Sequence, residues 1–557
     1  MPSELFRFKF RLRRRGALLS DGPMTECRTP QVYRPDRADG RFDAIVIGSG
    51  IGGLSAAAFL SKAGKRVLVL ERHYTMGGFT HSFRRKAWEW DVGVHYVGEF
   101  HKEGTVANLL MNDIGGGRLE WAPLPETYDR FVFPDRQYDF VTGREAFVEE
   151  LTRAFPTERD AITRYVELSD RVYAAAMKFF QQKALPRFLA TVAEPFLCRE
   201  FLRYSDQTTL ATLRRLTDDP KLIGVLTGQW GTYGLPPGES SFGIHAIVAS
   251  HYLDGAAYPV GGAGSIARSI LPTIEGAGGR LLVHAEVEQV LIRGDRAIGV
   301  RMAGGQEILA PVVLSDAGVV NTFGKLVGDE TRDRLGLGAR LSQTTPSVSH
   351  ICLYVGLNEP DESVGLEPTN LWIYSGYDHD RIVRAFRDEP DTPLPAIYMS
   401  FPSAKDPAWK ARRGDTATVD IISFVDYERF RPWEEKPWKK RGESYEELKA
   451  RYSEQLLASL YEHVPQAKGK VAFSELSTPL STRHFSNHLR GEIYGVSFTP
   501  ERFRLKWLAP RTPIRGLYLT GQDAVAHGVV GALYGGVVAA SVVLGRNVIK
   551  DAERRTA

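Results

Sequence analysis

The chain of 557 residues contains only three cysteines, Cys27, Cys198 and Cys352, and no two of them lie close together. This spacing excludes a cysteine metal motif and a disulfide framework, so a reducing compartment is expected. The histidines show no metal-ligand pair either, because His245 and His251 are six residues apart, whereas one helix face needs a separation of three or four. No metal site is predicted.

Long hydrophobic runs are also missing. No window of about 18 uninterrupted apolar residues occurs, so no membrane-spanning helix is predicted. The nearest candidate, 529–544, contains Gly531, Gly535 and Gly536. Its G-x-x-x-G spacing could mark a membrane dimerisation face, but the nucleotide-binding context favours a buried, closely packed helix.

Net charge is low, at +4, and nothing in it indicates a nucleic-acid partner. The N-terminal segment lacks an apolar stretch after its charges, so no secretory signal is predicted. Residues 6–12 instead alternate apolar with basic side chains and lead into three arginines at 13–15. Such an arm could contact an anionic membrane surface or be a disordered tail upstream of a true start at Met24. The expected localisation is cytoplasmic, with peripheral membrane contact as the open alternative.

What is present is a nucleotide-binding unit at 42–83, FDAIVIGSGIGGLSAAAFLSKAGKRVLVLERHYTMGGFTHSF. The apolar run 44–47 predicts a buried parallel strand, 52–61 has helical spacing, and 66–70 predicts a second strand. Strand, turn, helix, strand and acidic end follow in the order that makes a G-x-G-x-x-G motif specific for a dinucleotide.

The glycines have separate roles in this unit. Gly48 permits the tight turn, Gly50 lets the backbone approach a pyrophosphate, and Gly53 lets helix and strand pack closely. Glu71 ends the second strand, where its carboxylate can accept from a ribose 2′-hydroxyl.

NAD and FAD both use such a unit, and the residues after it separate them. Glu71 and Arg72 begin the run E-R-x-x-x-x-G-G, which ends at Gly77 and Gly78. This run resembles the extended FAD signature of the amine oxidase and phytoene desaturase superfamily, so FAD is the predicted cofactor.

A second cofactor contact is predicted near the C-terminus, where a strand at 516–520 meets Gly521 and Asp523 before a glycine-rich helix. The positive end of a helix can stabilise the pyrophosphate and the pyrimidine edge of a flavin. Asp523 is predicted to bond a flavin-side hydroxyl. The residues assigned to FAD are Gly48, Gly50, Ile51, Gly52, Gly53, Glu71, Arg72, Gly77, Gly78, Val287, Gly521, Asp523, Gly528, Val529 and Val530.

The predicted fold is α/β, a Rossmann-type FAD-binding domain that is split in sequence by an inserted α+β substrate domain. The predicted segments are a basic arm 1–41, FAD-binding parts 42–110, 255–345 and 481–557, a mostly helical substrate or membrane-facing part 111–254, and a second substrate part 346–480. Helices are expected at 165–180 and 188–216, broken at Pro186 and Pro195, with a hairpin within 288–315 and a frayed tail at 550–557.

Several pieces resemble one family, the retinol saturase branch of the phytoene desaturase and carotenoid isomerase family: DVGVHYVGE, HYLDGAAYPVGG, FPSAKDPAW, KKRGESYEELK, RGEIYGV and LTGQDAVAHGVVGALYGG. The resemblance extends from about residue 42 to 550. It implies a flavin enzyme acting on a long apolar polyene, as retinol saturase reduces the 13,14 double bond of all-trans-retinol, and it implies peripheral membrane association. The animal enzymes begin with a secretory-type signal that this chain does not show. A bacterial cytoplasmic relative is therefore expected, whose substrate need not be a retinoid.

Saturating an alkene needs a hydride on one carbon and a proton on its neighbour, so the protein must supply orientation, a dry tunnel and a proton donor. Tyr96 and Tyr258 are the preferred donors, since a tyrosine stays neutral in an apolar site. The full set of candidates is His95, Tyr96, His251, Tyr258, Glu492 and Tyr494.

Three functions stay open: a saturase or desaturase, a non-redox polyene isomerase, and a lipid-binding flavoprotein without activity. No second G-x-G-x-x-G follows a strand, so no separate NAD(P)H domain is predicted and the electron donor is unknown.

Overall fold

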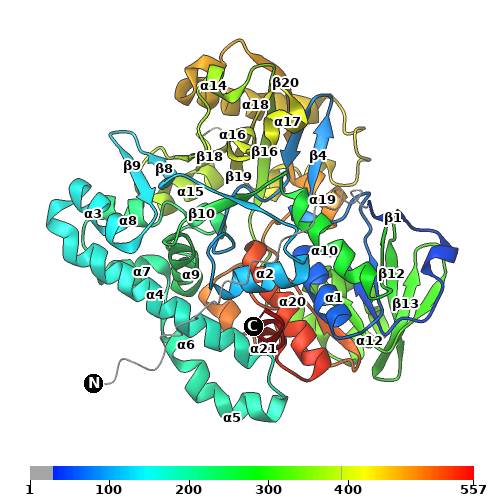
Figure 1. The fold of residues 1–557 in the computed structure, drawn as a ribbon. Coiled ribbons are helices and arrows are strands. Elements are labelled where there is room, and N and C mark those ends of the chain that lie inside the picture. The colour runs from blue at the N-terminus through cyan, green and yellow to red at the C-terminus, as the bar shows by residue number, and fades with distance from the viewer. Residues whose placement is uncertain (1–28, 390–391, 557) are drawn as a thin grey trace, which may run out of the picture.

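A computed structural model describes residues 29–389 and 392–556 (Figure 1). The nucleotide-binding part is built on a six-stranded parallel sheet in the order β1-β11-β3-β2-β15-β21. Its strands are β1 (Gln31–Val32), β2 (Ala44–Ile47), β3 (Val67–Leu70), β11 (Arg280–Val283), β15 (Val313–Ser315) and β21 (Leu517–Leu519). The four inner strands are almost wholly buried and apolar, as expected for parallel strands covered on both faces. The prediction of a Rossmann-type sheet split in sequence is confirmed.

The segment 29–41 does not belong to a free arm. Its strand β1 pairs with β11 at the edge of the nucleotide sheet, so the predicted boundary at residue 41 is wrong by at least ten residues. The basic residues 6–15 and Met24 lie outside the described residues.

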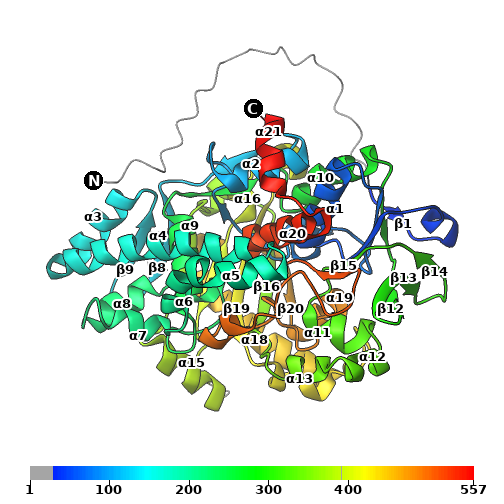
Figure 2. The same ribbon diagram turned by 90° about the horizontal axis from the view of Figure 1, so that it is seen from below.

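Helices α1 (Ile51–Lys62), α10 (Gly264–Gly276) and α20 (Gly528–Leu544) cover this sheet, and α1 and α20 lie side by side in both views (Figure 2). A β-carbon at Gly536 would collide with Ser55 and the backbone of Gly52 and Ala56 on α1. The small residues of α20 therefore serve close helix packing, as predicted.

The C-terminal segment is helical, although a frayed tail was expected. Helix α21 (Val548–Thr556) is anchored to α2 (Val106–Gly115) by a bidentate contact from Arg555 to Asp113, with N–O distances of 3.0 and 2.6 Å. Among the described residues, no single helix is long and apolar enough to cross a membrane, although α20 and α21 pass that test together across a 102° bend.

The substrate part is built on a seven-stranded mixed sheet in the order β20-β16-β19-β18-β17-β8-β9. Its strands are β8 (Thr127–Val132), β9 (Gln137–Val141), β16 (Ser349–Leu357), β17 (Asn370–Ile373), β18 (Ile397–Ser400), β19 (Ala417–Val425) and β20 (Val471–Ser477). The segment predicted as mostly helical, 111–254, thus contributes two strands to this sheet, besides β7 (Trp121–Pro123) in another, because β8 pairs with β17 far along the chain. Only β8 and β17 are parallel neighbours in this sheet.

One face of this sheet carries two cross-strand rows of different chemistry. In the first row, Tyr354 pairs with Asp420 and Asp420 with Ser400, while Asn370 pairs with Asp129. This row is polar, and all five residues are buried.

The second row lies two residues further along each strand. Cys352 pairs with Ile422, Ile422 with Tyr398, Tyr398 with Trp372, and Trp372 with Phe131. Because alternate residues of a strand share a face, this aromatic and apolar row lies beside the polar one. The opposite face packs into a separate core with α18 (Glu443–His463).

A helical layer completes the molecule with α4 (Arg159–Gln182), α5 (Arg187–Leu197), α6 (Arg199–Ser205), α7 (Thr209–Leu213) and α9 (Phe242–Tyr252) (Figure 1). The predicted break at Pro195 is wrong, because α5 contains Pro195 in its last turn and ends at Leu197. Pro186 does precede the first residue of α5, where proline is tolerated.

Candidate functional site

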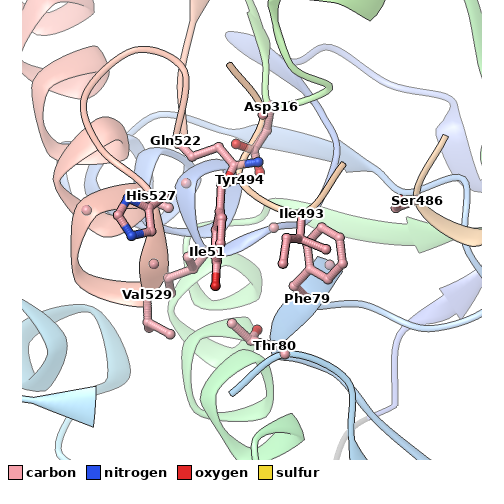
Figure 3. Close-up of a pocket in the computed structure, with 18 of the residues that line it drawn as sticks. Ile51, Phe79, Thr80, Asp316, Ser486, Ile493, Tyr494, Gln522, His527 and Val529 are labelled. Carbon is pink, nitrogen blue, oxygen red and sulfur yellow. The ribbon is translucent and has the colours of Figure 1, made fainter. Parts of the chain in front are cut away.

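A single cavity of about 1060 Å³ joins the glycine-rich turn of the nucleotide part to the aromatic row of the substrate sheet. Figure 3 shows its centre, where Ile51, Asp316, Gln522 and Val529 of the nucleotide part converge on Tyr494. Because it lies outside the carboxyl ends of parallel strands β2, β3 and β15, it occupies the position where such sheets bind nucleotides.

The glycine-rich turn is shaped for a close backbone approach. Gly48 has a φ of +94°, which side chains rarely adopt. A β-carbon at Gly50 would lie 2.5 Å from a carboxylate oxygen of Asp316, and one at Gly52 would collide with Gly521. A β-carbon at Gly53 would collide with the carbonyl oxygen of Gly48, in keeping with its predicted packing role. These residues suit a bound dinucleotide.

Glu71 and Arg72, both assigned to the cofactor from the sequence, line the cavity and are hydrogen-bonded to the protein. Glu71 accepts from the backbone nitrogen of Ser49 at 2.8 Å and from that of His73 at 2.8 Å. Arg72 donates to the carbonyl oxygen of His484 at 2.8 Å and lies 3.4 Å from Glu286. A carboxylate oxygen has two acceptor sites, so Glu71 retains capacity for a ribose hydroxyl.

Asp523 makes protein contacts that the sequence did not indicate. Its carboxylate accepts from the backbone nitrogens of Val319 at 2.8 Å and Val496 at 3.0 Å. Arg502, which is buried, donates to the carbonyl oxygens of Val496 at 2.6 Å and Gln522 at 2.9 Å. Asp523 thus joins three segments at the cavity wall, and its predicted bond to a flavin hydroxyl stays a prediction.

Thirteen of the fifteen residues assigned to the cofactor line the cavity: Gly48, Gly50, Ile51, Gly52, Glu71, Arg72, Gly77, Gly78, Val287, Asp523, Gly528, Val529 and Val530. Gly53 and Gly521 are not among the lining residues and act through close packing.

Asp316, which the sequence did not single out, lies among the glycines of the nucleotide-binding turn. Burial raises the pKa of its carboxyl to about 8, although a hydrogen bond from the backbone of Gly53 opposes the shift. The carboxyl is therefore held largely neutral near pH 7, which allows a negatively charged pyrophosphate nearby. The available signal was the position of Asp316, directly after strand β15 at the nucleotide edge of the sheet.

Five of the six predicted proton donors line the cavity. The hydroxyl of Tyr96 donates to Asp129 at 2.8 Å, and that of Tyr494 donates to the carbonyl oxygen of Gly231 at 3.0 Å. Each proton is therefore already bound to an acceptor within the protein.

His251 and Glu492 are engaged as well. The Nδ1 atom of His251 lies 3.0 Å from Glu99, and its Nε2 accepts from the backbone of Gly98 at 2.9 Å. Glu492 accepts from the backbone nitrogen of Arg490 at 2.8 Å.

Tyr258, one of the two preferred donors, is not among the residues that line the cavity. It is buried, and its hydroxyl donates to Asp91. The structure does not support the preference for Tyr258, because its hydroxyl is bonded to Asp91 and does not line the cavity.

His95 differs from these residues. Its ring lines the cavity and its Nδ1 lies 3.3 Å from Asp420 without hydrogen-bond geometry. Burial lowers the pKa of His95 to about 3, so its ring is neutral near pH 7, and burial raises the pKa of Asp420 well above its usual range, which favours the protonated carboxyl. Asp420 and the neighbouring Lys405 are functional candidates that sequence reasoning missed. No group of acidic, histidine or cysteine residues that could hold a metal occurs in the described part of the chain.

Comparisons with known proteins agree with this geometry. A family model described as an NAD(P)-binding Rossmann-like domain matches residues 46–112. All-trans-retinol 13,14-reductase of Danio rerio is 35% identical over 541 residues, covering 94% of this chain and 89% of the relative. Prolycopene isomerase 1 of an Oncidium hybrid cultivar is 27% identical, covering 90% and 83%.

Among solved structures, putrescine oxidase bound to putrescine superposes with a TM-score of 0.59 at 18% identity, covering 91% of this chain and all of that one. This likeness confirms the predicted amine-oxidase-like fold and, at such low identity, shows the fold alone. The identity to the Danio rerio reductase and the coverage of both chains are high enough to show the family. The chain belongs to the all-trans-retinol 13,14-reductase family of oxidoreductases.

Proposed function

We propose that the protein is an FAD-dependent oxidoreductase that saturates a double bond of a long, apolar polyene. The observation that carries the proposal is the continuity of the cavity, which joins the dinucleotide-binding residues and the aromatic row of the substrate sheet in one space. An enzyme of this kind must hold a flat cofactor and an elongated apolar substrate in contact, away from water.

The residues at the nucleotide end of the cavity support FAD, because Arg72, Gly77 and Gly78 of the extended FAD run line it. Gly50 and Gly52 line the cavity, Glu71 can accept from the ribose, and α20 begins at Gly528 on the cavity wall, so its N-terminus can stabilise a pyrophosphate. When bound and reduced, FAD supplies a hydride. The protein orients the substrate, excludes water and supplies the accompanying proton.

The substrate side supports a polyene. Trp372, Tyr398, Ile422 and Phe424 of the substrate sheet line the cavity beside residues of α9, including Val248. Flat aromatic walls favour a rigid conjugated chain, which loses little conformational entropy on binding. The names of the two relatives, a retinol reductase and a prolycopene isomerase, point to polyenes of different length.

A polyene isomerase is the second candidate, favoured by the 27% identical prolycopene isomerase. It would use the same cavity and return the substrate with unchanged mass. A lipid-binding flavoprotein without activity would leave every polyene unchanged.

Contact with a membrane surface is part of the proposal, because a polyene is delivered from lipid. Helix α5 exposes Phe188 (76%), Val192 (57%) and Phe196 (84%). It is tied to the end of α4 by a bond from Gln182 to the carbonyl oxygen of Ala190 at 3.0 Å, next to α4 residues that line the cavity. An apolar helix face of this kind can enter the interfacial layer of a bilayer.

The test is mass spectrometry of products. FAD-loaded protein, chemically reduced under argon, is incubated with all-trans-retinol, a carotenoid precursor or a polyunsaturated fatty acid. A product heavier by two hydrogen atoms is expected and names the substrate class. Unchanged mass with altered retention would instead show an isomerase, and a product lighter by two hydrogen atoms with oxidised flavin would show a desaturase.

A further inference from the structure

Behind the cavity wall lies a buried cluster of charged groups that packing alone does not explain. Lys405 is 4% exposed and sits among the carboxyls of Asp91, Asp129 and Asp420, which are 2%, 0% and 0% exposed. Removing so many ionisable groups from water is costly unless they are paired or neutral.

Lys405 is held by neutral acceptors. Its ammonium donates to the hydroxyl of Ser400 at 2.7 Å, to the carbonyl oxygen of His95 at 3.1 Å, and to the side-chain oxygen of Asn370. Lys405 therefore fixes the backbone of the cavity residue His95, and burial lowers the pKa of the lysine amine to about 7, so it is partly protonated near neutral pH.

Two of the carboxyls have donors. Asp129 accepts from Tyr96, Gln229 and Asn370 at 2.8 to 2.9 Å. Asp91 accepts from Ser82 at 2.7 Å, from the backbone of Ala263 at 2.9 Å and from Tyr258.

Asp420 is different, because neither of its oxygens has a hydrogen-bond partner in the described part of the chain. The nearest basic atom is Nδ1 of His95, at 3.3 Å, which is itself unbonded. A buried carboxyl and an imidazole that is only 11% exposed thus face each other, and the histidine lines the cavity. His350 and His527 also line the cavity with an unbonded Nδ1, but no acidic side chain lies at ion-pair distance from either among the described residues.

We propose that His95 delivers the proton to the substrate carbon and that Asp420 supplies this proton to His95 from behind the cavity wall. This inference rests on the proposed reduction. His95 is then the catalytic residue, because it touches the substrate, whereas Asp420 and Lys405 position and supply it.

The step balances as follows. One alkene carbon receives a hydride from a reduced flavin, and the other receives a proton as the Nε2–H bond of His95 breaks and a C–H bond forms. At the same time Nδ1 accepts the proton of Asp420, so the ring stays neutral and no imidazolate forms. Asp420 is left as a carboxylate, which Lys405 stabilises in its protonated form. After product release, water returns a proton to Nε2 of His95 and Nδ1 returns its proton to Asp420, which restores the starting state.

The electrostatics agree with this order of events. Burial lowers the pKa of His95 to about 3, which excludes an imidazolium donor near pH 7, and a neutral imidazole is too weak an acid to act alone. Burial also raises the pKa of Asp420, while Lys405 opposes that shift and favours the carboxylate that the step leaves behind.

The test compares Asp420→Asn and His95→Phe with the control Asp361→Asn. Asp361 is a carboxyl of the same part of the molecule that accepts from Ser403 at 2.6 Å and does not line the cavity. Each FAD-loaded variant is reduced, mixed with saturating polyene and followed through a single turnover, and substrate affinity is measured separately on the oxidised protein.

Asp420→Asn and His95→Phe are expected to slow reduction by about 100-fold or more, the usual contribution of a general acid, with unchanged affinity. The control should keep the wild-type rate. In wild type the rate should fall as pH rises through the pKa of Asp420, and Asp420→Asn should lose this dependence. The other titratable groups around the pair are Lys405, Asp91, Asp129, Tyr258, His350, Cys352, Tyr354 and Tyr398.

An infrared measurement tests the acid without turnover. The carbonyl band of a protonated carboxyl should appear at pH 8 in the difference between wild type and Asp420→Asn, and should be absent from the difference between wild type and Asp361→Asn. Wild-type rates in both cavity variants, or absence of the band, would overturn the inference while leaving the reductase function intact. A wild-type protein that reduces no polyene would overturn both.

Discussion

Replacing Gly536 by alanine should separate the two helices that carry the dinucleotide cradle. A β-carbon there would lie 2.5 Å from the carbonyl oxygen of Gly52 and 2.7 Å from the backbone nitrogen of Ala56, besides striking Ser55. The serine hydroxyl can turn away, but the two backbone atoms belong to α1 and cannot.

The magnitude follows from the geometry. Restoring ordinary contact of at least 3.4 Å from 2.5 Å requires α1 and α20 to move apart by about 0.9 Å. A gap of roughly that size forfeits a quarter to a half of the dispersion energy along the interface. Overpacking of this kind costs about 1–3 kcal/mol, and the gain of about 1 kcal/mol from replacing a helical glycine offsets only part of it.

The matched control is Gly276→Ala, at the exposed end of α10, where an added β-carbon meets no atom within 4 Å. Urea denaturation followed by circular dichroism and by release of bound flavin should show a lower midpoint and weaker FAD retention for Gly536→Ala. Gly276→Ala should equal or slightly exceed wild type. If Gly536→Ala matched its control in both measurements, the argument for close packing of α1 and α20 would be refuted.

Three further predictions concern other parts of the molecule. Tyr258→Phe should lower stability by about 1 kcal/mol, since Asp91 loses a donor, yet keep the wild-type rate of polyene reduction in a single-turnover assay, because Tyr258 does not line the cavity. Phe196→Ser combined with Phe188→Ser should reduce sedimentation with lipid vesicles several-fold without changing reduction of detergent-solubilised substrate, and unchanged sedimentation would contradict membrane contact through α5. Burial lowers the pKa of His245 to about 3, so the unfolded chain binds more protons than the folded protein below pH 6.5, and the free energy of unfolding falls as the pH falls towards 3. At pH 5 this loss is about 2 kcal/mol. In denaturant titrations, the decline between pH 7 and pH 5 should therefore be about 2 kcal/mol smaller for His245→Gln than for wild type.

The nucleotide-binding unit could be predicted because its determinants are local. The strand at 44–47, the glycines that follow and the acidic Glu71 lie within one short segment, and a β-carbon at Gly50, Gly52 or Gly53 would collide with a neighbouring atom. The substrate sheet could not be predicted in full, since β8 is completed by β17 more than two hundred residues away. The hydrophobic periodicity of one segment does not indicate which distant strand will pair with it.

The same limit applies to the candidate site. Tyr96 and Tyr258 were equivalent as sequence, and only the fold shows that one lines the cavity and the other lies behind it. Asp420 did carry a signal, because a lone acidic residue inside the apolar strand β19 must be paired, neutral or functional. Its partner His95 comes from a loop more than three hundred residues earlier, so the pairing itself was invisible.

The position of Asp420 also bears on the choice between reduction and isomerisation. Shifting a double bond between cis and trans forms returns every proton that the substrate borrows, so an isomerase gains nothing from an acid that gives its proton away. Net reduction consumes one proton in each turnover, and the proton must reach a cavity from which water is excluded. A neutral carboxyl behind an unbonded histidine, with Lys405 placed to stabilise the carboxylate that remains, is the arrangement that this requirement predicts. If Asp420 supplies the proton as proposed, the buried cluster serves net reduction rather than isomerisation.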